Sequence, residues 1–418
     1  MKNSANTQFK ELQSNSSYVI SLEAPSKEYR KLYLFQKIFT FLCNAISLTI
    51  AAAGILVYTP VSYVLFFFVD CIPMPKNIKS SINGLLKVFV VHSFLSFFSF
   101  LVSNKIYAAQ DSRIAKRDKG IVISNHLCDF DWLFLGVYFR MVKKLKYMFV
   151  VMKEPLSRIP LVGYIIKKMG HVFVKRNIDL GPVSSQPLEV LQKSAKLIDG
   201  MKKGFLLIFP EGTYMHDSAH ERSIRYLEQH PYEFEGGQYI PRNVLTPKES
   251  GFNAILSSLN SLEGIVDLTI FTNPFTKKLD DIKNIFWHML FGSREFSLVI
   301  VADFIPQEKI IGSPRYLQEI FCEKDKLISR FEQLTLEKSG KELDSYKIRS
   351  SQELEEFLLE NRPKVSYEYR SISFYSPYWP LYILLMPVIC LSCYNIAVYL
   401  VSAIHFLLQV KPLQLLRY

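Results

Sequence analysis

Three long stretches of this chain carry no charged residue, and they constrain its fold more than any other feature. They cover residues 38–69, 88–104 and 371–410. A helix that spans a bilayer needs about 20 predominantly apolar residues. Residues 38–58 meet this length, 88–104 are marginal and suit a shallow or re-entrant helix, and the last stretch suits two short helices. Because buried core helices rarely run this long without a charge, the pattern predicts an integral membrane protein.

The middle of the chain has a different pattern, in which short β-like runs alternate with helical ones. This alternation predicts an α/β fold with a mostly parallel sheet and flanking helices. The predicted strands cover residues 120–124, 147–152, 171–174, 204–209, 265–271 and 296–302, and the predicted helices between them cover 131–142 and 187–202. The pattern over residues 312–362 is helical and charged.

These patterns divide the chain into five segments. The first is polar and lacks a cleavable signal pattern, because the apolar run begins too late. The expected segments are a polar N-terminal segment at 1–37, N-terminal membrane helices at 38–104, the α/β domain at 105–310, a helical extension at 311–370 and C-terminal membrane helices at 371–418.

The charge of the chain is unevenly distributed. The net charge is +12, and residues 105–176 alone hold 15 basic against 5 acidic residues, an excess of 10. A basic cluster beside an apolar segment is typical of the cytoplasmic side of a membrane protein and attracts anionic head groups. The aromatic residues lie in apolar runs rather than among these basic residues, which disfavours nucleic acid as a partner. A hydrophobic content of 49% excludes a disordered chain, and six cysteines are too few for a disulfide scaffold.

A histidine and an aspartate flank the first predicted turn of the α/β domain. His126 follows the strand at 120–124, and Asp131 begins the next predicted helix. If the turn folds back, the Asp131 carboxylate can accept a hydrogen bond from one ring nitrogen of His126 and leave the other nitrogen as a general base. A substrate that brings its own hydroxyl needs no protein nucleophile, and Cys128 is an alternative thiol nucleophile. For this spacing alone, a structural histidine is the default interpretation.

Two further predicted strands end in residues that suit a ligand. Lys175 and Arg176 follow the third strand and are suited to a phosphate. Glu211 and Gly212 follow the fourth, where the glycine permits close approach of the backbone. The carboxyl ends of parallel strands lie at one edge of a sheet, where α/β folds bind ligands. We therefore expect these residues to converge with the histidine and aspartate.

Four blocks of the middle segment resemble those of the glycerolipid acyltransferases of the lysophosphatidic acid acyltransferase type, in the same order and with similar spacing. The blocks are Asn125-His126-x4-Asp131, Gly170-x-x-Phe173-x-x-Arg176, Phe209-Pro210-Glu211-Gly212-Thr213 and Val244-Leu245-Thr246-Pro247. The details, including the helix around Phe321-Cys322-Glu323-Lys324-Asp325, are most similar to the eukaryotic lysophospholipid branch, which includes lysocardiolipin and lysophosphatidylinositol acyltransferases. The departures from the family pattern are Leu127-Cys128, His171 and Tyr214.

This resemblance implies a reaction and a role for each residue. His126 would deprotonate the free hydroxyl of a lysophospholipid, which attacks the thioester of acyl-CoA, and Asp131 would orient His126. The implied substrate-binding residues are Lys175 and Arg176 for the acceptor phosphate, Glu211, Gly212 and Thr213 for the glycerol end, and Pro247 for the acyl channel. The resemblance implies no metal and no cofactor, and acyl-CoA is a co-substrate.

The expected function is acylation of a lysophospholipid of the lysophosphatidylinositol type, in phospholipid synthesis or acyl-chain remodelling. The expected location is the endoplasmic reticulum membrane, with the active site facing the cytoplasm. The alternatives are a lysophosphatidic acid acyltransferase that makes phosphatidic acid, a catalytically silent membrane lipid-binding homologue, and a thioester hydrolase that uses Cys128. The sequence contains no GxSxG elbow, P-loop or GxGxxG, which removes the common hydrolase, kinase and dinucleotide-binding classes. Cys390 and Cys393 form a lone CxxC without a second pair, so a zinc or redox role is disfavoured.

Overall fold

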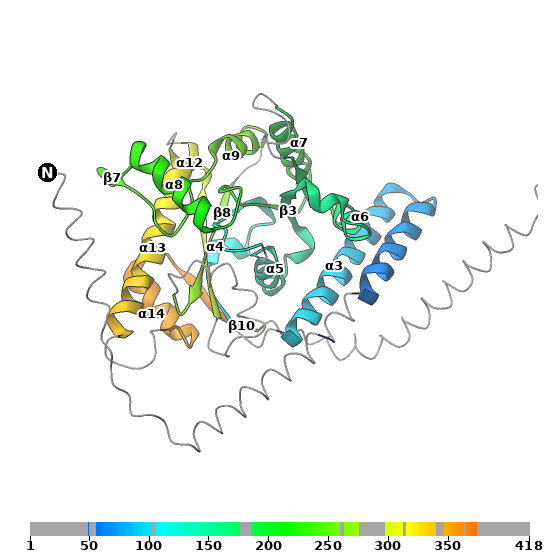
Figure 1. Cartoon of the computed structure of the whole chain (residues 1–418). Helices are drawn as coiled ribbons and strands as arrows, with labels where there is room; N and C mark the ends of the chain where they lie inside the picture. Colours follow the sequence, from blue (N-terminus) through cyan, green and yellow to red (C-terminus); the bar gives the residue numbers. More distant parts are fainter. Residues whose placement is uncertain are drawn as a thin grey trace, which may run out of the picture. The chain divides into compact units, whose positions relative to one another are not determined.

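The computed structural model describes residues 49, 56–101, 105–129, 131–175, 185–259, 263–275, 297–311, 315–339, 347–362 and 365–373. Its central feature is an eight-stranded sheet with the strand order β10-β1-β9-β8-β2-β5-β3-β4 (Figure 1). The strands are β1 (Lys105–Asp111), β2 (Lys119–Ser124), β3 (Met148–Lys153), β4 (Val172–Val174), β5 (Gly204–Ile208), β8 (Gly264–Asn273), β9 (Ser297–Pro306) and β10 (Tyr367–Ser373). A separate hairpin pairs β6 (Tyr232–Phe234) with β7 (Gly237–Tyr239).

Most of the strand pairs in this sheet are parallel. The neighbours β8, β2, β5, β3 and β4 all run in one direction. β9 is antiparallel to β8, β1 is parallel to β9, and β10 is antiparallel to β1. The carboxyl ends of the five strands from β8 to β4 therefore lie along one edge of the sheet, and the predicted α/β fold with a mostly parallel sheet is confirmed.

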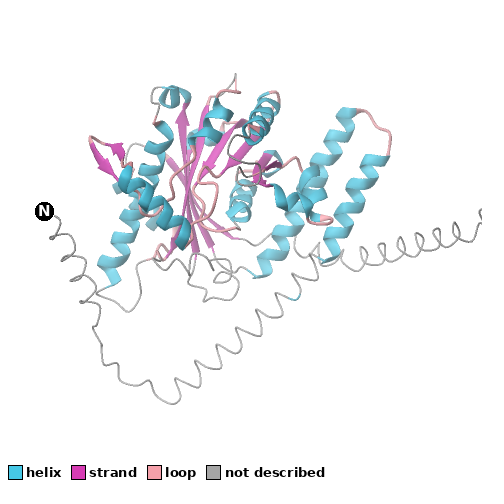
Figure 2. Ribbon diagram, turned by 45° about the horizontal axis from the view of Figure 1, so that its top comes forward, coloured by secondary structure: helices cyan, strands magenta, loops and turns pink. Residues whose placement is uncertain are grey.

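Helices cover both faces of the sheet (Figure 2). Alternate strand residues point to opposite faces, so Val122 of β2 packs with α5, whereas Ile121 and Ile123 pack with α7, α9, α13 and α14. Burial on both faces explains why the strands form continuous apolar runs in the sequence.

The helices are α3 (Lys76–Leu101), α4 (Ser112–Ala115), α5 (Asp131–Met141), α6 (Val162–Lys168), α7 (Gln186–Asp199), α8 (Asp217–Gln229), α9 (Glu249–Leu256), α12 (Gln307–Ile311), α13 (Tyr316–Ser339) and α14 (Ser351–Asn361), with the 3-10 helices η1 (Leu145–Tyr147) and η2 (Glu154–Arg158).

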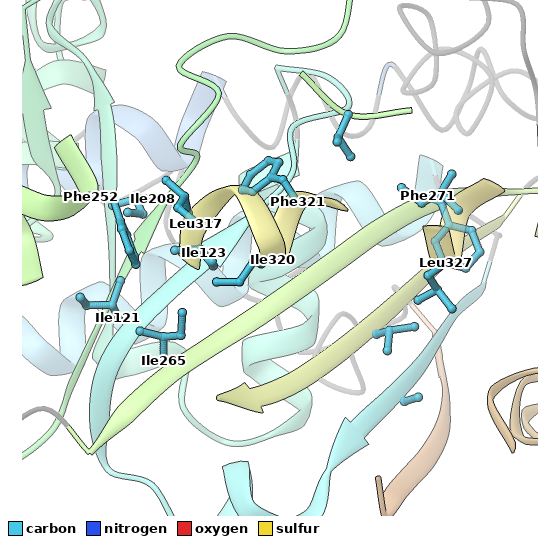
Figure 3. Packing of buried hydrophobic residues seen from close by; sticks show 14 of the residues in the cluster. Ile121, Ile123, Ile208, Phe252, Ile265, Phe271, Leu317, Ile320, Phe321 and Leu327 are labelled. Carbon is cyan, nitrogen blue, oxygen red and sulfur yellow. The ribbon is translucent and has the colours of Figure 1, made fainter. Parts of the chain in front are cut away.

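Helix α13 belongs to the core of the domain. Leu317, Ile320 and Phe321 follow one another at helical spacing, so they lie on one side of the helix. They belong to the same buried cluster as Ile123 and Ile265 of the strands (Figure 3). The Phe321 side chain is completely buried, and burial of a side chain of this kind contributes about 1.5–3 kcal/mol to stability.

The fold differs from the predicted division of the chain at residue 310. Helices α13 and α14 lie in the predicted helical extension 311–370, but their apolar side chains pack against the sheet. β10 crosses the predicted boundary at 370 and pairs with β1 along its whole length. The α/β core therefore extends from Lys105 to Ser373. All six predicted strands are present, whereas the sequence patterns did not predict β1 or β10.

Two helices precede the sheet, one over residues 56–71 and the other α3. α3 contains most of the predicted membrane segment 88–104. Within the ranges that the structure describes, no helix is long and apolar enough to cross a membrane. Most of the predicted span 38–58 and all residues after 373 lie outside the described residues.

Polar contacts attach these two helices to the sheet domain. The buried Lys87 of α3 donates a hydrogen bond from Nζ to the carbonyl oxygen of Met148, at the start of β3, at 2.7 Å. Asp70 accepts a hydrogen bond from the hydroxyl of Tyr164 on α6 at 2.7 Å, and it also pairs with Lys168 of α6. The helices therefore contact the elements that lead into β3 and β4, two of the strands that end at the predicted ligand edge.

Candidate active site at the carboxyl ends of the strands

The predicted site residues follow neighbouring strands of the sheet. His126 comes two residues after β2, Glu211 three residues after the adjacent β5, and Lys175 directly after β4. Because these strands are parallel, the three residues lie at the same edge of the sheet. β4 is three strands away from β2, which corresponds to roughly 14 Å at the usual strand spacing. His126 and Glu211 therefore lie close together, as predicted, whereas Lys175 lies farther away along the same edge.

His126 and Asp131 form the hydrogen-bonded pair that their spacing predicts. The distance from Nδ1 of His126 to Oδ2 of Asp131 is 2.8 Å. The Asp131 side chain is fully buried in the first turn of α5, and it also accepts hydrogen bonds from the backbone N–H groups of Leu127 and Cys128. A carboxylate can only accept, so Nδ1 carries the ring proton and Nε2 presents a lone pair. No described residue is hydrogen-bonded to Nε2.

The backbone of His126 is held as firmly as its ring. Its N–H donates to Oε2 of Glu211 at 2.8 Å, and its carbonyl oxygen accepts from the N–H of Met215 at 2.9 Å. The imidazole ring stacks on Phe209, with ring centroids 4.3 Å apart. The residue before it, Asn125, bonds both backbone groups of Ile270 at 2.8 Å and so continues the β2–β8 pairing with its side chain. The imidazole is therefore preorganised at the sheet edge.

Glu211 connects two loops of the site. The prediction gave it a role at the glycerol end of the substrate, but its side chain is buried and both of its oxygens are engaged. Oε2 accepts from His126, and Oε1 accepts from the N–H of Leu245 at 2.9 Å. Glu211 is thus a positioning residue, which fixes His126 relative to the loop that contains Pro247.

The other predicted residues of the third and fourth blocks differ in exposure. Gly212 is exposed and has a φ of +71°, in the left-handed region, and its N–H closes a turn on the Phe209 carbonyl. A side chain at this position would meet the amine of Lys248. Thr213 is half-buried beside it, and Pro247 is buried. Gly212 and Thr213 therefore directly follow the carboxylate that bonds His126, whereas Pro247 is a buried residue of the loop that Glu211 holds.

A buried aspartate of α13 holds the loop that leads to Pro247. Asp325 accepts hydrogen bonds from the N–H groups of Arg242 and Asn243 and from the hydroxyl of Tyr239. The loop therefore connects Asp325 to Glu211, and through Glu211 to His126. The sequence patterns did not predict this role, because the bonded residues are more than 80 positions apart.

The structure describes one of the two predicted basic residues. Lys175 is exposed at the end of β4, and Arg176 lies outside the described residues. Lys153, at the end of β3, was not predicted, although it also follows an apolar strand and so carries the same signal as Lys175. Its Nζ is 3.6 Å from the carboxylate of Asp129 and 5.8 Å from the ring centroid of Tyr214, which in turn lies edge-on to His126. Lys153 is thus a cation on the same side of the site as Tyr214, which contacts the histidine.

The thiol of Cys128 faces the aspartate. Sγ is 3.4 Å from Oδ1 of Asp131, and the Cys128 side chain is buried. A thiol in this position donates a hydrogen bond to the carboxylate that orients His126. This geometry favours a supporting role for Cys128 over the alternative of a thiol nucleophile.

The burial of Glu211 predicts a pH effect on stability. Burial raises the pKa of Glu211 from 4.5 to about 8, although the two N–H donors lower it. Between these values the folded chain binds more protons at this residue than the unfolded chain does, so the free energy of unfolding falls as the pH rises from about 5 to 8. The Glu211→Gln variant cannot ionise there, and we expect a shallower fall. Denaturant unfolding of the detergent-solubilised proteins at constant ionic strength measures both slopes, and equal slopes would contradict the prediction.

Comparisons with known proteins agree with the motifs. The sequence model of the family described as Acyltransferase matches residues 105–271. An uncharacterized acyltransferase of Schizosaccharomyces pombe is 25% identical over 164 residues, which cover 38% of this chain and 43% of that protein. Lysocardiolipin acyltransferase 1 of Danio rerio is 24% identical over 37% of each chain. The 1-acyl-sn-glycerol-3-phosphate acyltransferase 3 of Arabidopsis thaliana is 24% identical over 49% of this chain and 53% of that one.

The extent of these matches is limited. They span about a third to a half of the length of the curated relatives. The crystal structure of the 1-acyl-sn-glycerophosphate acyltransferase of Thermotoga maritima aligns with a TM-score of 0.42 at 15% identity, over 71% of this chain and 97% of that one. The resemblance inferred from the four blocks is confirmed at the level of the family, because the Acyltransferase family model matches residues 105–271, which contain all four blocks.

Proposed function

We propose that this chain transfers an acyl group from acyl-CoA to the free hydroxyl of a lysophospholipid. The observation that carries the proposal is the hydrogen bond between His126 and the buried Asp131, which leaves Nε2 of the ring available as a base at the ligand edge of the sheet. The match of residues 105–271 to the Acyltransferase family supports the reaction class. Two of the relatives are named for different acceptors, lysocardiolipin and 1-acyl-sn-glycerol-3-phosphate, and this supports a lysophospholipid as the acceptor.

The geometry suggests how the residues act in this reaction. Nε2 of His126 removes the proton of the acceptor hydroxyl, and the oxygen attacks the thioester carbonyl carbon to give a tetrahedral intermediate. The C–S bond then breaks, an ester forms, and the imidazolium returns its proton to the departing thiolate of coenzyme A. Asp131 fixes the tautomer of the neutral ring and stabilises the imidazolium that forms. Glu211 keeps His126 in register with the loop of Pro247.

We propose a phospholipid of the lysophosphatidylinositol type as the acceptor, and lysophosphatidic acid as the alternative. Both carry a phosphate next to the glycerol. The ammonium of Lys153 lies against Asp129, in the turn between His126 and Asp131, and against Tyr214, whose ring contacts His126, and this supports a role at that phosphate. The phosphate of either acceptor is only about 5 Å from the hydroxyl that reacts. This short distance favours Lys153 over a cation at the far end of the sheet edge.

We also propose that the chain is an integral protein of the endoplasmic reticulum membrane with its active site on the cytoplasmic face. The uncharged stretches 38–69 and 371–410 and the basic excess over residues 105–176 support this location. Phe67 and Phe68 of the first described helix and Leu85 of α3 are 47%, 51% and 64% exposed. Large exposed apolar side chains of this kind suit contact with lipid rather than water.

The proposed reaction is tested with membranes that contain the full chain, labelled acyl-CoA and each of three acceptors, namely lysophosphatidylinositol, lysophosphatidic acid and lysocardiolipin. We expect labelled phospholipid to form, fastest with lysophosphatidylinositol. A silent lipid-binding homologue would label none of the three, and a hydrolase would release free fatty acid at the same rate with or without an acceptor.

The Cys128→Ser variant separates acyl transfer from thiol-based hydrolysis. A serine hydroxyl can donate the same hydrogen bond to Asp131, so we expect transfer to fall by less than about threefold, since a hydrogen bond of this kind contributes only about 1 kcal/mol. The initial rate with saturating acyl-CoA measures the effect. Complete loss of activity in this variant would show that the sulfur is the nucleophile.

A further inference from the structure

A pocket lies beside β4, away from the His126–Asp131 pair. It has a volume of about 190 Å³ and is formed by the end of β4, by η2 and by the first half of α7. Phe173, Pro187 and Val190 provide its apolar walls. A cavity of about 150 Å³ is sufficient to hold benzene, so this pocket has room for a flat aromatic ring.

Two cations border the same pocket. Lys175 of the β4 end and Lys193 of α7 both line it, and both side chains are exposed. Two carboxylates also line the pocket: Glu154 pairs with Arg158 at 3.0 Å, and Glu189 accepts a hydrogen bond from Ser185 at 2.6 Å. A pocket with an aromatic wall and two lysines suits a ligand that combines a flat ring with phosphate groups.

The distance from His126 to this pocket matches the length of the pantetheine arm of coenzyme A. β4 is three strands from β2, so the pocket begins roughly 14 Å from His126 along the sheet edge. The pantetheine arm of coenzyme A has about thirteen bonds between its sulfur and its first phosphorus, which in an extended chain span roughly 15 Å. The acceptor phosphate lies only about 5 Å from the reacting hydroxyl and cannot reach this pocket while the hydroxyl is at His126.

We propose that this pocket binds the phosphoadenosine end of acyl-CoA, with the adenine against Phe173 and the phosphates at Lys175 and Lys193. The proposal rests on the proposed function, because it identifies where the donor of that reaction is held. It assigns Lys175 to the donor, whereas the resemblance of the four blocks implies that Lys175 binds the acceptor phosphate. The pantetheine arm then runs along the ends of β3 and β5 and brings the thioester to Nε2 of His126.

Two measurements on detergent-purified full chain test this assignment. The first is the equilibrium binding of adenosine 3′,5′-bisphosphate, which needs no catalysis. The second is the KM of acyl transfer with acyl-CoA and with acyl-pantetheine, a thioester that lacks the nucleotide. Both are made for the wild type, for Lys193→Ala, and for the control Lys196→Ala, which removes an exposed lysine from the same helix but outside the pocket.

We expect Lys193→Ala to weaken bisphosphate binding about tenfold and to raise the KM for acyl-CoA by a similar factor, as loss of one charge-assisted contact would. The KM for acyl-pantetheine should keep its wild-type value, and Lys196→Ala should match the wild type throughout. Unchanged bisphosphate binding in Lys193→Ala, or equal changes for the two donors, would overturn the assignment. A wild type that binds the bisphosphate in this way but transfers no acyl group would instead refute the proposed function.

Discussion

Acyl transfer by the His126→Ala variant should be at least about a thousandfold slower than transfer by the wild type. A positioned general base contributes roughly 10²- to 10⁴-fold to such reactions, and the chain offers no substitute at this position, because Asp131 is buried behind the ring. The measurement is the initial rate of labelled phospholipid formation from acyl-CoA at saturating acceptor. The His126→Gln variant should be similarly slow, since an amide can bond Asp131 but cannot accept the proton.

This variant tests chemistry rather than folding. The two hydrogen bonds that hold His126 to Glu211 and Met215 come from its backbone, so alanine keeps them. The loss is confined to the ring, which is already 12% exposed, and to its stacking on Phe209, worth about 1 kcal/mol. His230→Ala, at an exposed position after α8, is the matched control and should transfer at the wild-type rate. A His126→Ala protein with near wild-type activity would refute the mechanism.

The part of the site that the sequence predicts is the part that depends on local geometry. His126 and Asp131 are five residues apart in one strand-to-helix turn, so their spacing alone indicates that they can meet. The role of Glu211 depends on bonds to residues 85 and 34 positions away, which no local pattern reveals. Glutamate after an apolar strand predicts only that a carboxylate lies at the sheet edge, and its burial becomes visible only in the fold.

The fold, like the site, is predictable from the sequence only where local patterns determine it. Apolar runs identify β2, β5 and β8, because strands buried on both faces must be apolar throughout. An apolar run does not indicate whether a strand lies parallel or antiparallel to its neighbour, so the antiparallel pairing of β8 with β9 was not predicted. β10 combines tyrosines with charged residues and is paired on one side with β1, more than 250 residues earlier in the chain. Its sequence resembles a solvent-facing segment, and only the long-range pairing makes it a strand.

One polar group in this core has a large predicted effect on stability. Lys324 of α13 is completely buried, pairs with Asp267 of β8, and donates to the carbonyl oxygen of Leu268 at 2.7 Å. Asp267 stands opposite Asp303 of β9, which has its own partner in Arg362 at 2.9 Å. Burial raises the pKa of Asp267 and lowers that of Lys324, so each group depends on the other to stay charged.

We expect Lys324→Met to lower the free energy of unfolding by about 3–5 kcal/mol, the usual cost when one partner of a buried ion pair is removed. Methionine fills most of the volume of the lysine stem, so a cavity contributes little. The loss arises because Asp267 remains buried beside Asp303 without a cation, and must either stay charged at high cost or take up a proton. Denaturant unfolding of the purified chain, followed by intrinsic fluorescence, measures the difference from the wild type.

Two further variants separate charge from packing. Lys326→Met lies two residues further along α13 and removes a partly exposed pair with Glu235, so it should cost less than about 1 kcal/mol. Lys324→Met combined with Asp267→Asn leaves no buried unpaired charge at this pair, and it should recover most of the stability lost in the single variant. If the double variant is no more stable than Lys324→Met alone, the lysine acts through its packing on Phe321 and the Leu268 carbonyl rather than through the ion pair. If Lys324→Met is as stable as Lys326→Met, the pair is not what attaches α13 to the sheet, and the apolar cluster around Phe321 alone holds the helix in place.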